Sequence, residues 1–116
     1  MTSTFCLRIA AISGFLTVAL GAFGAHGLKA LLTEYNTVDI WDKAVLYQMF
    51  HTLALLLLAF RPTVNTGAAM SFLIGICVFS GSLYLLALTN VRWLGAITPL
   101  GGLAFLIGWV LLFWKL

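Results

Sequence analysis

The sequence predicts an all-α membrane protein, folded as an antiparallel bundle of about four transmembrane helices in a single domain that covers residues 1–116. The first observation is composition: 63% of the residues are hydrophobic and 8% are charged, whereas a soluble domain carries roughly 25% charged residues. The second is the presence of four apolar runs of spanning length, separated by polar connections. The third is size, because so short a chain cannot bury this many apolar side chains in a soluble core.

The first apolar run, residues 9–27, follows Arg8 and contains no ionised residue. Its 19 positions approach the roughly 20 that a spanning helix needs. A cleaved signal peptide is the alternative, because Ala22 and Gly24 flank Phe23 in a small-x-small pattern. The apolar runs that follow favour a retained helix.

The longest polar connection, residues 28–43, leads into the second predicted helix, residues 40–60. Leucines and a tyrosine recur in this connection at helical spacing, which is compatible with a short helix lying in the membrane interface. Asp39 is expected to cap the second helix, and Pro62 follows its end because proline cannot continue a helix.

The third and fourth helices are predicted at residues 67–89 and 93–114, joined by a short turn. Pro99 lies inside the fourth range. Such a proline most often kinks a helix, and the alternative is a break that lines a cavity, as in transporters.

Four spans place both termini on one side of the membrane. Each side then carries three basic residues: Arg8, Arg61 and Lys115 on the terminal side, and Lys29, Lys43 and Arg92 on the other. The count of basic residues is therefore tied. All three acidic residues lie on the other side, but acids weigh little in the positive-inside rule, so cytoplasmic termini are only weakly favoured.

Polar side chains are expected to gather inside the half of the bundle that faces the long connection. This polar intramembrane cluster is predicted to comprise His26, Tyr47, Gln48, His51, Ser80, Ser82, Tyr84 and Thr98. His51 is expected to point into the bundle, uncharged and hydrogen-bonded, since an unsatisfied polar group in hydrocarbon is costly. The alternative is a ligand or proton role. For His26, either the helix unwinds at Gly24 or Gly27 or the side chain faces the headgroups.

Small residues predict close helix packing, because glycine lets two backbones approach in a membrane. The candidate packing positions are Gly14, Gly21, Gly24, Gly27, Gly81, Gly101 and Gly102. Leucine at Gly21 or Gly24 is expected to separate the first helix from its neighbour.

Several functional classes find no support in the sequence. The net charge of +3 is scattered, so nucleic acid is not expected as a partner. No metal or cofactor is expected, because Cys6 and Cys77 lie far apart and the two histidines have no third ligand. No catalytic residue is assigned, since Ser80-Gly81-Ser82 has no neighbouring base.

Four ordered motifs resemble the YgdD-type small bacterial inner-membrane proteins, a domain-of-unknown-function family with small eukaryotic relatives. The motifs are residues 21–28, residues 47–48 with 51–54, residues 79–84 with 86–88, and residues 98–102 with Gly108-Trp109. The resemblance extends over nearly the whole chain, and it implies a multi-pass protein of the bacterial inner membrane with no established catalytic activity.

We therefore expect a protein without enzymatic chemistry that acts by packing against membrane lipids, a second copy of itself or a membrane-protein partner. The alternative is a carrier or channel-like module that passes a small polar solute or a proton through the polar half. An intramembrane enzyme or quinone-binding subunit using His26 and His51 is less well supported, since no paired base or metal set accompanies them.

Overall fold

The computed structural model describes residues 1–115, which form helices and no strand. This agrees with the predicted all-α class. In chain order the helices are α1 (Ser3–Ala25), α2 (Lys29–Glu34), α3 (Val38–Ala59), α4 (Thr66–Gly75), the π-helix η1 (Ile76–Ser80), α5 (Gly81–Thr89), the 3₁₀ helix η2 (Arg92–Ala96) and α6 (Thr98–Trp114).

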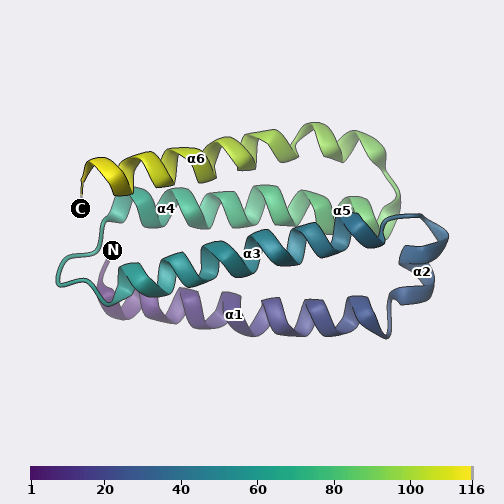
Figure 1. The fold of residues 1–116 in the computed structure, drawn as a ribbon, viewed down its shortest axis with the longest axis horizontal. Coiled ribbons are helices and arrows are strands. Elements are labelled where there is room, and N and C mark those ends of the chain that lie inside the picture. The colour runs from purple at the N-terminus through teal and green to yellow at the C-terminus, as the bar shows by residue number, and fades with distance from the viewer. Residues whose placement is uncertain (116) are drawn as a thin grey trace.

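The helices form four long antiparallel rods, namely α1, α3, the segment α4–η1–α5, and α6, which run side by side in Figure 1. The third rod is continuous through α4, η1 and α5, and its neighbours are α3 on one side and α6 on the other. α1 packs mainly against α3. The principal extents are 47 × 26 × 16 Å. The two termini lie at one end of the molecule, and α2 lies at the opposite end.

Three of these helical segments in the described chain are long and apolar enough to cross a membrane: residues 3–25, 66–89 and 92–114. α3 has a comparable length of 22 residues, but it carries charges near its start and polar side chains in its interior. It lies between α1 and the third rod (Figure 1). The four expected helices are therefore three strongly apolar segments and α3, which is more polar than the others.

The first two long helices begin earlier than expected. α1 begins at Ser3 instead of residue 9, because the Thr2 hydroxyl accepts a hydrogen bond from the Phe5 amide at 3.1 Å and caps the helix. α3 begins at Val38, and its cap position is Thr37. Asp39 therefore lies in the first turn, and its expected role as the cap residue is wrong.

Pro99 is the second residue of α6, directly after the 3₁₀ segment η2. The first turn of a helix tolerates proline because that position needs no amide donor. The expected kink inside a continuous helix is therefore not found. The predicted fourth helix instead changes from a 3₁₀ segment to an α-helix next to Pro99.

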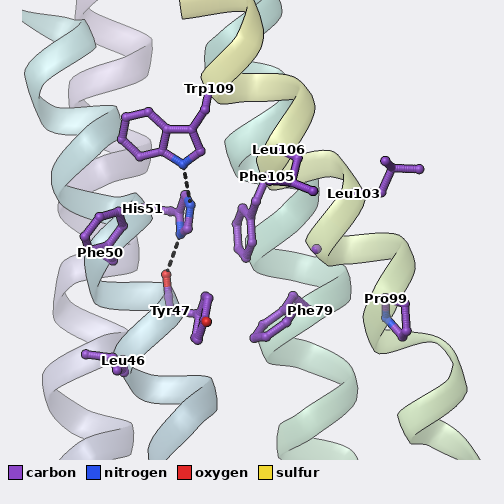
Figure 2. Close-up of a pocket in the computed structure, with 11 residues that line it drawn as sticks. Leu46, Tyr47, Phe50, His51, Phe79, Pro99, Leu103, Phe105, Leu106 and Trp109 are labelled. Atoms are coloured by element: carbon purple, nitrogen blue, oxygen red, sulfur yellow. Dashed lines mark hydrogen bonds between the residues drawn. The ribbon is translucent and has the colours of Figure 1, made fainter.

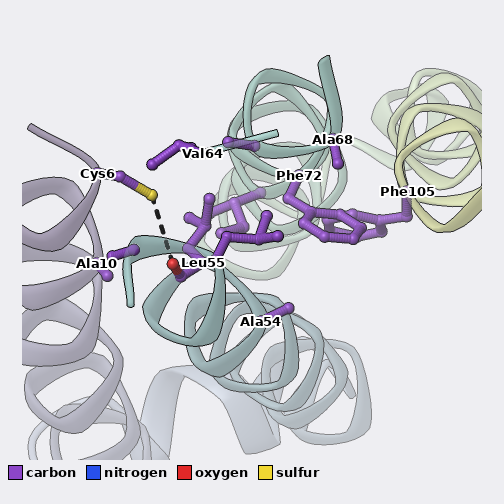
Figure 3. Close-up of a cluster of buried hydrophobic side chains, with 12 residues drawn as sticks. Cys6, Ala10, Ala54, Leu55, Val64, Ala68, Phe72 and Phe105 are labelled. Atoms are coloured by element: carbon purple, nitrogen blue, oxygen red, sulfur yellow. Dashed lines mark hydrogen bonds between the residues drawn. The ribbon is translucent and has the colours of Figure 1, made fainter. Parts of the chain in front are cut away.

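The largest apolar core lies in the half of the bundle that contains the termini (Figure 3). α1 contributes Cys6 and Ala10, which face Leu55 of α3, and the Cys6 thiol donates to the Leu55 carbonyl at 3.4 Å. Phe72 from α4 and Phe105 from α6 complete the cluster. A smaller core around Trp41, Leu32 and Ala87 lies toward α2.

The predicted packing glycines differ in how closely a neighbour approaches. A β-carbon at Gly24 would overlap the Trp41 indole, and one at Gly101 would overlap the Phe79 backbone. At Gly14, Gly21 and Gly102 it would make ordinary contacts of 3.5–3.8 Å with a side chain of another helix.

Two of the predicted packing glycines contact no neighbouring helix. At Gly27 a β-carbon would meet only the nearby Phe23, and at Gly81 it would meet nothing within 4 Å. Two glycines outside the prediction, Gly75 and Gly108, are tightly packed against Phe105 and Phe72. Both of these additional contacts join α6 to the third rod, as the contact of Gly101 does. In α6 the sequence pattern had singled out only Gly101 and Gly102 for packing.

Candidate functional site

Gln48 connects three helices through its side-chain amide. The Tyr84 hydroxyl on α5 donates to the Gln48 oxygen at 2.6 Å, and the Gln48 nitrogen donates to the Ser13 carbonyl of α1 at 3.2 Å. Ser13 in turn shares a hydrogen bond of 2.6 Å with Thr52 of α3. The polar face of α3 thus meets the small-residue face of α1.

A second bond fixes the same two helices nearer α2. The Trp41 indole N–H donates to the Leu20 carbonyl at 2.9 Å, and the ring lies where Gly24 leaves space. These bonds use the side chains internally, since an unsatisfied polar group would be costly in hydrocarbon.

His51 lies between α3 and α6, with 3% of its surface exposed. Its Nδ1 is 2.9 Å from the Tyr47 carbonyl, and its Nε2 is 3.1 Å from the Trp109 indole nitrogen. A carbonyl can only accept and an indole N–H can only donate. These two bonds, dashed in Figure 2, require a neutral His51 with its proton on Nδ1.

Aromatic rings surround this histidine. The Phe105 ring stacks on the imidazole with a centroid distance of 3.6 Å and an interplanar angle of 7°. Phe72 and Trp109 approach at 5.4 and 5.8 Å. Since both ring nitrogens are bonded within the protein, the imidazole has no free position for a metal or a transferred proton.

His51 also lies deeper than expected. Thirteen residues separate it from Val38 and eight from Ala59, which corresponds to about 20 Å and about 12 Å along the helix. The expected restriction of polar groups to the half nearest α2 is therefore wrong for His51. His51 already lies just past the midpoint of the predicted range, residues 40–60, and α3 extends that range by two residues at its start.

The remaining predicted cluster residues are divided between separate positions. Ser80 donates to the Ala44 carbonyl at 2.7 Å, joining the third rod to α3. Ser82 and Thr98 share a hydrogen bond of 2.6 Å between α5 and α6. His26 follows the last residue of α1 and is exposed near the α2 end, so the structure does not bring it together with the others.

An open groove of about 880 Å³ runs between α3 and α6 (Figure 2). Phe79 of η1 lies between its two sides, which are formed by Leu46, Tyr47, Phe50 and His51 of α3 and by Pro99, Gly102, Leu103, Phe105, Leu106 and Trp109 of α6. No lining residue is charged. Its volume lies in the range of ligand sites, about 300–1,000 Å³.

The π-helix helps to form this groove. π-turns are often found at functional sites, and here the turn places the Phe79 backbone against Gly101 of α6 while the Phe79 ring lines the groove. α3 and α6 are joined across it by the Trp109–His51 bond.

The charged residues lie near the ends of the rods, away from the groove. Within residues 1–115, no group of three or more histidine, cysteine or acidic side chains is placed to hold a metal ion.

Sequence reasoning missed Trp109 as the partner of His51, as well as Thr52 and the stacked Phe105. The available signal was a tryptophan inside an apolar run, five residues before its end, because an indole N–H needs an acceptor in hydrocarbon. Nothing in the sequence indicates which acceptor it meets.

Comparison with known proteins identifies relatives over most of the chain. A family model described as a protein of unknown function (DUF423) matches residues 20–102. The chain is 48% identical to the UPF0382 membrane protein SERP0230 of Staphylococcus epidermidis over 90% of this chain and 88% of that one. It is 45% identical to the UPF0382 inner membrane protein YgdD of Escherichia coli, covering 97% and 88%. For YwdK of Bacillus subtilis the identity is 43%, covering 90% and 89%. No solved structure gives a significant match.

Proposed function

The chain belongs to the DUF423 family of membrane proteins of unknown function, and from this premise we propose that it is a non-enzymatic lipid-interacting protein of the bacterial inner membrane. In this proposal the groove between α3 and α6 holds a long apolar chain from the surrounding lipid. The supporting observation is the groove itself, with about 880 Å³ of space and no charged lining residue.

Depth supports an apolar occupant. The α3 residues that line the groove lie eight to thirteen positions after Val38, or about 12–20 Å along a helix that is about 33 Å long. A hydrocarbon core is about 30 Å thick. The groove therefore faces acyl chains, and any space that the protein leaves there is filled by lipid or by another apolar group.

The interior bonding favours this role over the alternative of a carrier or channel. Gln48, Ser13, Thr52 and His51 all bond to protein groups, and no buried side-chain polar atom in residues 1–115 lacks a partner. A polar solute would have to replace these bonds. Proteoliposomes containing the protein should therefore show no proton flux above protein-free vesicles, and a protein-dependent flux would favour the carrier.

Photocrosslinking tests the lipid role. The protein is placed in nanodiscs with a phospholipid that carries a diazirine midway along one acyl chain, and the labelled residues are identified by mass spectrometry. Labels should concentrate on the groove side of α6, at Leu103 and Leu106. Equal labelling of all exposed apolar positions would contradict a preferred site.

A matched pair of variants sharpens this test. Leu106 and Leu100 are both on α6 and are 64% and 65% exposed, but only Leu106 lines the groove. Leu106→Trp should fill part of the groove and reduce labelling of Leu103 severalfold, whereas Leu100→Trp should leave it unchanged. The same effect from both variants would argue against occupancy of the groove.

A further inference from the structure

The Tyr47 hydroxyl is the one polar side-chain atom of the groove without a hydrogen-bond partner among the described residues. The other polar side chains that line the groove, His51 and Trp109, bond to each other. The Tyr84 hydroxyl also has a protein acceptor, at Gln48. Tyr47 instead is 39% exposed, and its ring lies on the groove wall (Figure 2).

Tyr47 lies near the middle of α3, and therefore near the middle of the hydrocarbon layer in the proposed arrangement of the bundle across the membrane. Nine residues separate Tyr47 from Val38 and twelve from Ala59, which gives about 14 Å and about 18 Å along α3. Water is absent at that depth, so an unpaired donor is unfavourable. The ester oxygens of a phospholipid lie at the edges of the hydrocarbon core and are too distant to accept its proton.

The rings around Tyr47 in the groove are aromatic and tilted to one another, with the Phe79 ring at 39° to the Tyr47 ring. The Phe79 ring lies 4.5 Å from the Tyr47 ring, and the Phe105 ring lies 6.3 Å away. Aromatic walls of this kind pack well against another planar ring. With no charged lining residue, the groove suits a neutral ligand with a planar head and an apolar tail.

We propose that the occupant is a lipid-soluble quinone, whose ring packs against Tyr47 and Phe79 and whose carbonyl oxygen accepts the Tyr47 hydroxyl proton in a hydrogen bond. The proposal rests on the proposed function, because the tail takes the apolar groove. The ligand is bound and not reduced. Tyr47 supplies one hydrogen bond, and both nitrogens of His51 are already used.

Nuclear magnetic resonance of the tyrosines tests this assignment directly. The chain has three tyrosines, so labelling with ¹³Cζ-tyrosine in nanodiscs gives three signals, and Tyr47→Phe assigns the relevant one. A benzoquinone with a decyl tail should shift the Tyr47 signal in a saturable way and leave those of Tyr35 and Tyr84 in place. Decylbenzene has a ring and the same tail but no carbonyl, so it should not reproduce the shift.

Affinity provides the second measurement. Tyr47→Phe keeps the ring and removes the donor, so it should weaken binding of the decyl quinone about five- to tenfold and leave decylbenzene binding unchanged. An unchanged thermal melt of the variant shows that the fold is intact. Equal quinone affinity in both proteins would overturn the proposal.

The outcomes separate this proposal from the broader one. If the quinone and decylbenzene bind alike while the diazirine lipid still labels Leu103, the quinone assignment falls and the lipid groove stands. If neither compound binds and labelling is uniform, both fall. Disulfide-linked dimers of Leu103→Cys, made with Cys77→Ser, would show a second copy in the groove and would also overturn the quinone proposal.

Discussion

His51 is held in one tautomer by two partners whose roles cannot be exchanged. The Tyr47 carbonyl requires a proton on Nδ1, and the Trp109 indole requires a lone pair on Nε2. The sequence alone predicted a buried, hydrogen-bonded His51, because charge and unsatisfied donors are both unfavourable in hydrocarbon. It could not predict the tautomer, since that depends on which groups of two different helices meet the ring.

Trp109→Phe should destabilise the protein by removing the donor to His51 while keeping an aromatic ring. We expect the free energy of unfolding in mixed micelles to fall by about 0.6–1.7 kcal/mol, the range of side-chain hydrogen bonds in membrane proteins. Trp114→Phe is the control, because Trp114 is on the same helix and 76% exposed. Equal losses in the two variants would mean that the His51 bond contributes nothing specific.

The closest contacts between helices occur at a few glycines, where an added side chain would overlap the neighbouring helix. Glycine spacing in α1 suggested a continuous close contact, but only Gly24 of its predicted packing glycines is tightly packed. α6 contacts the third rod tightly at Gly101 and Gly108, where Phe79 and Phe72 fill the space. Sequence identified small residues correctly as packing candidates, but the rotation of each helix decides which of them face a neighbour.

Gly101→Ala should destabilise the contact between α6 and η1, because the new β-carbon would overlap the Phe79 backbone, which cannot rotate away. We expect a loss of about 1–3 kcal/mol in the free energy of unfolding. Gly102→Ala is the matched control, since its β-carbon would lie 3.8 Å from the Phe79 side chain. Equal stability of the two variants would show that η1 and α6 can move apart at little cost.

The π-turn shows the limit of prediction for elements. Residues 76–80 have the same apolar character as the rest of the predicted third helix, and the helix itself was expected at 67–89. A π-turn inserts one residue into a helix without a distinctive local sequence, so hydrophobic periodicity does not reveal it. The contacts of the π-turn become visible only in the tertiary structure, where the Phe79 backbone packs against Gly101 and the Ser80 hydroxyl donates to the Ala44 carbonyl.

The whole molecule places its termini at one end and α2 at the other (Figure 1). Three basic side chains belong to the terminal end and three to the α2 end, and all three acidic residues lie toward α2. The net positive charge therefore lies at the terminal end. The positive-inside rule counts basic residues, and their number is equal at the two ends, so it does not fix the orientation. The prediction that the two ends lie on opposite sides of the membrane rests on the length of the rods instead.

Cysteine labelling should place the two ends on opposite sides of the membrane. Ser3→Cys and Glu34→Cys are suitable, because both positions are exposed. Asn36 is avoided because its φ of 55° suits few side chains. In spheroplasts, with both native cysteines replaced by serine, a membrane-impermeant maleimide should label one variant and not the other. Labelling of both from outside would exclude the bundle as a spanning unit.

The sequence by itself determined the solvent, the helical class, the order of the rods and the polar character of α3. These follow from composition and from local periodicity, which are properties of neighbouring residues. The tertiary structure decided that Trp109 reaches His51, that Tyr47 faces a groove and that His26 stands apart. Such pairings depend on how far each helix is rotated and shifted along its axis. Successive residues point about 100° apart around a helix, so a small rotation of one packed helix changes which of its side chains meet a neighbour.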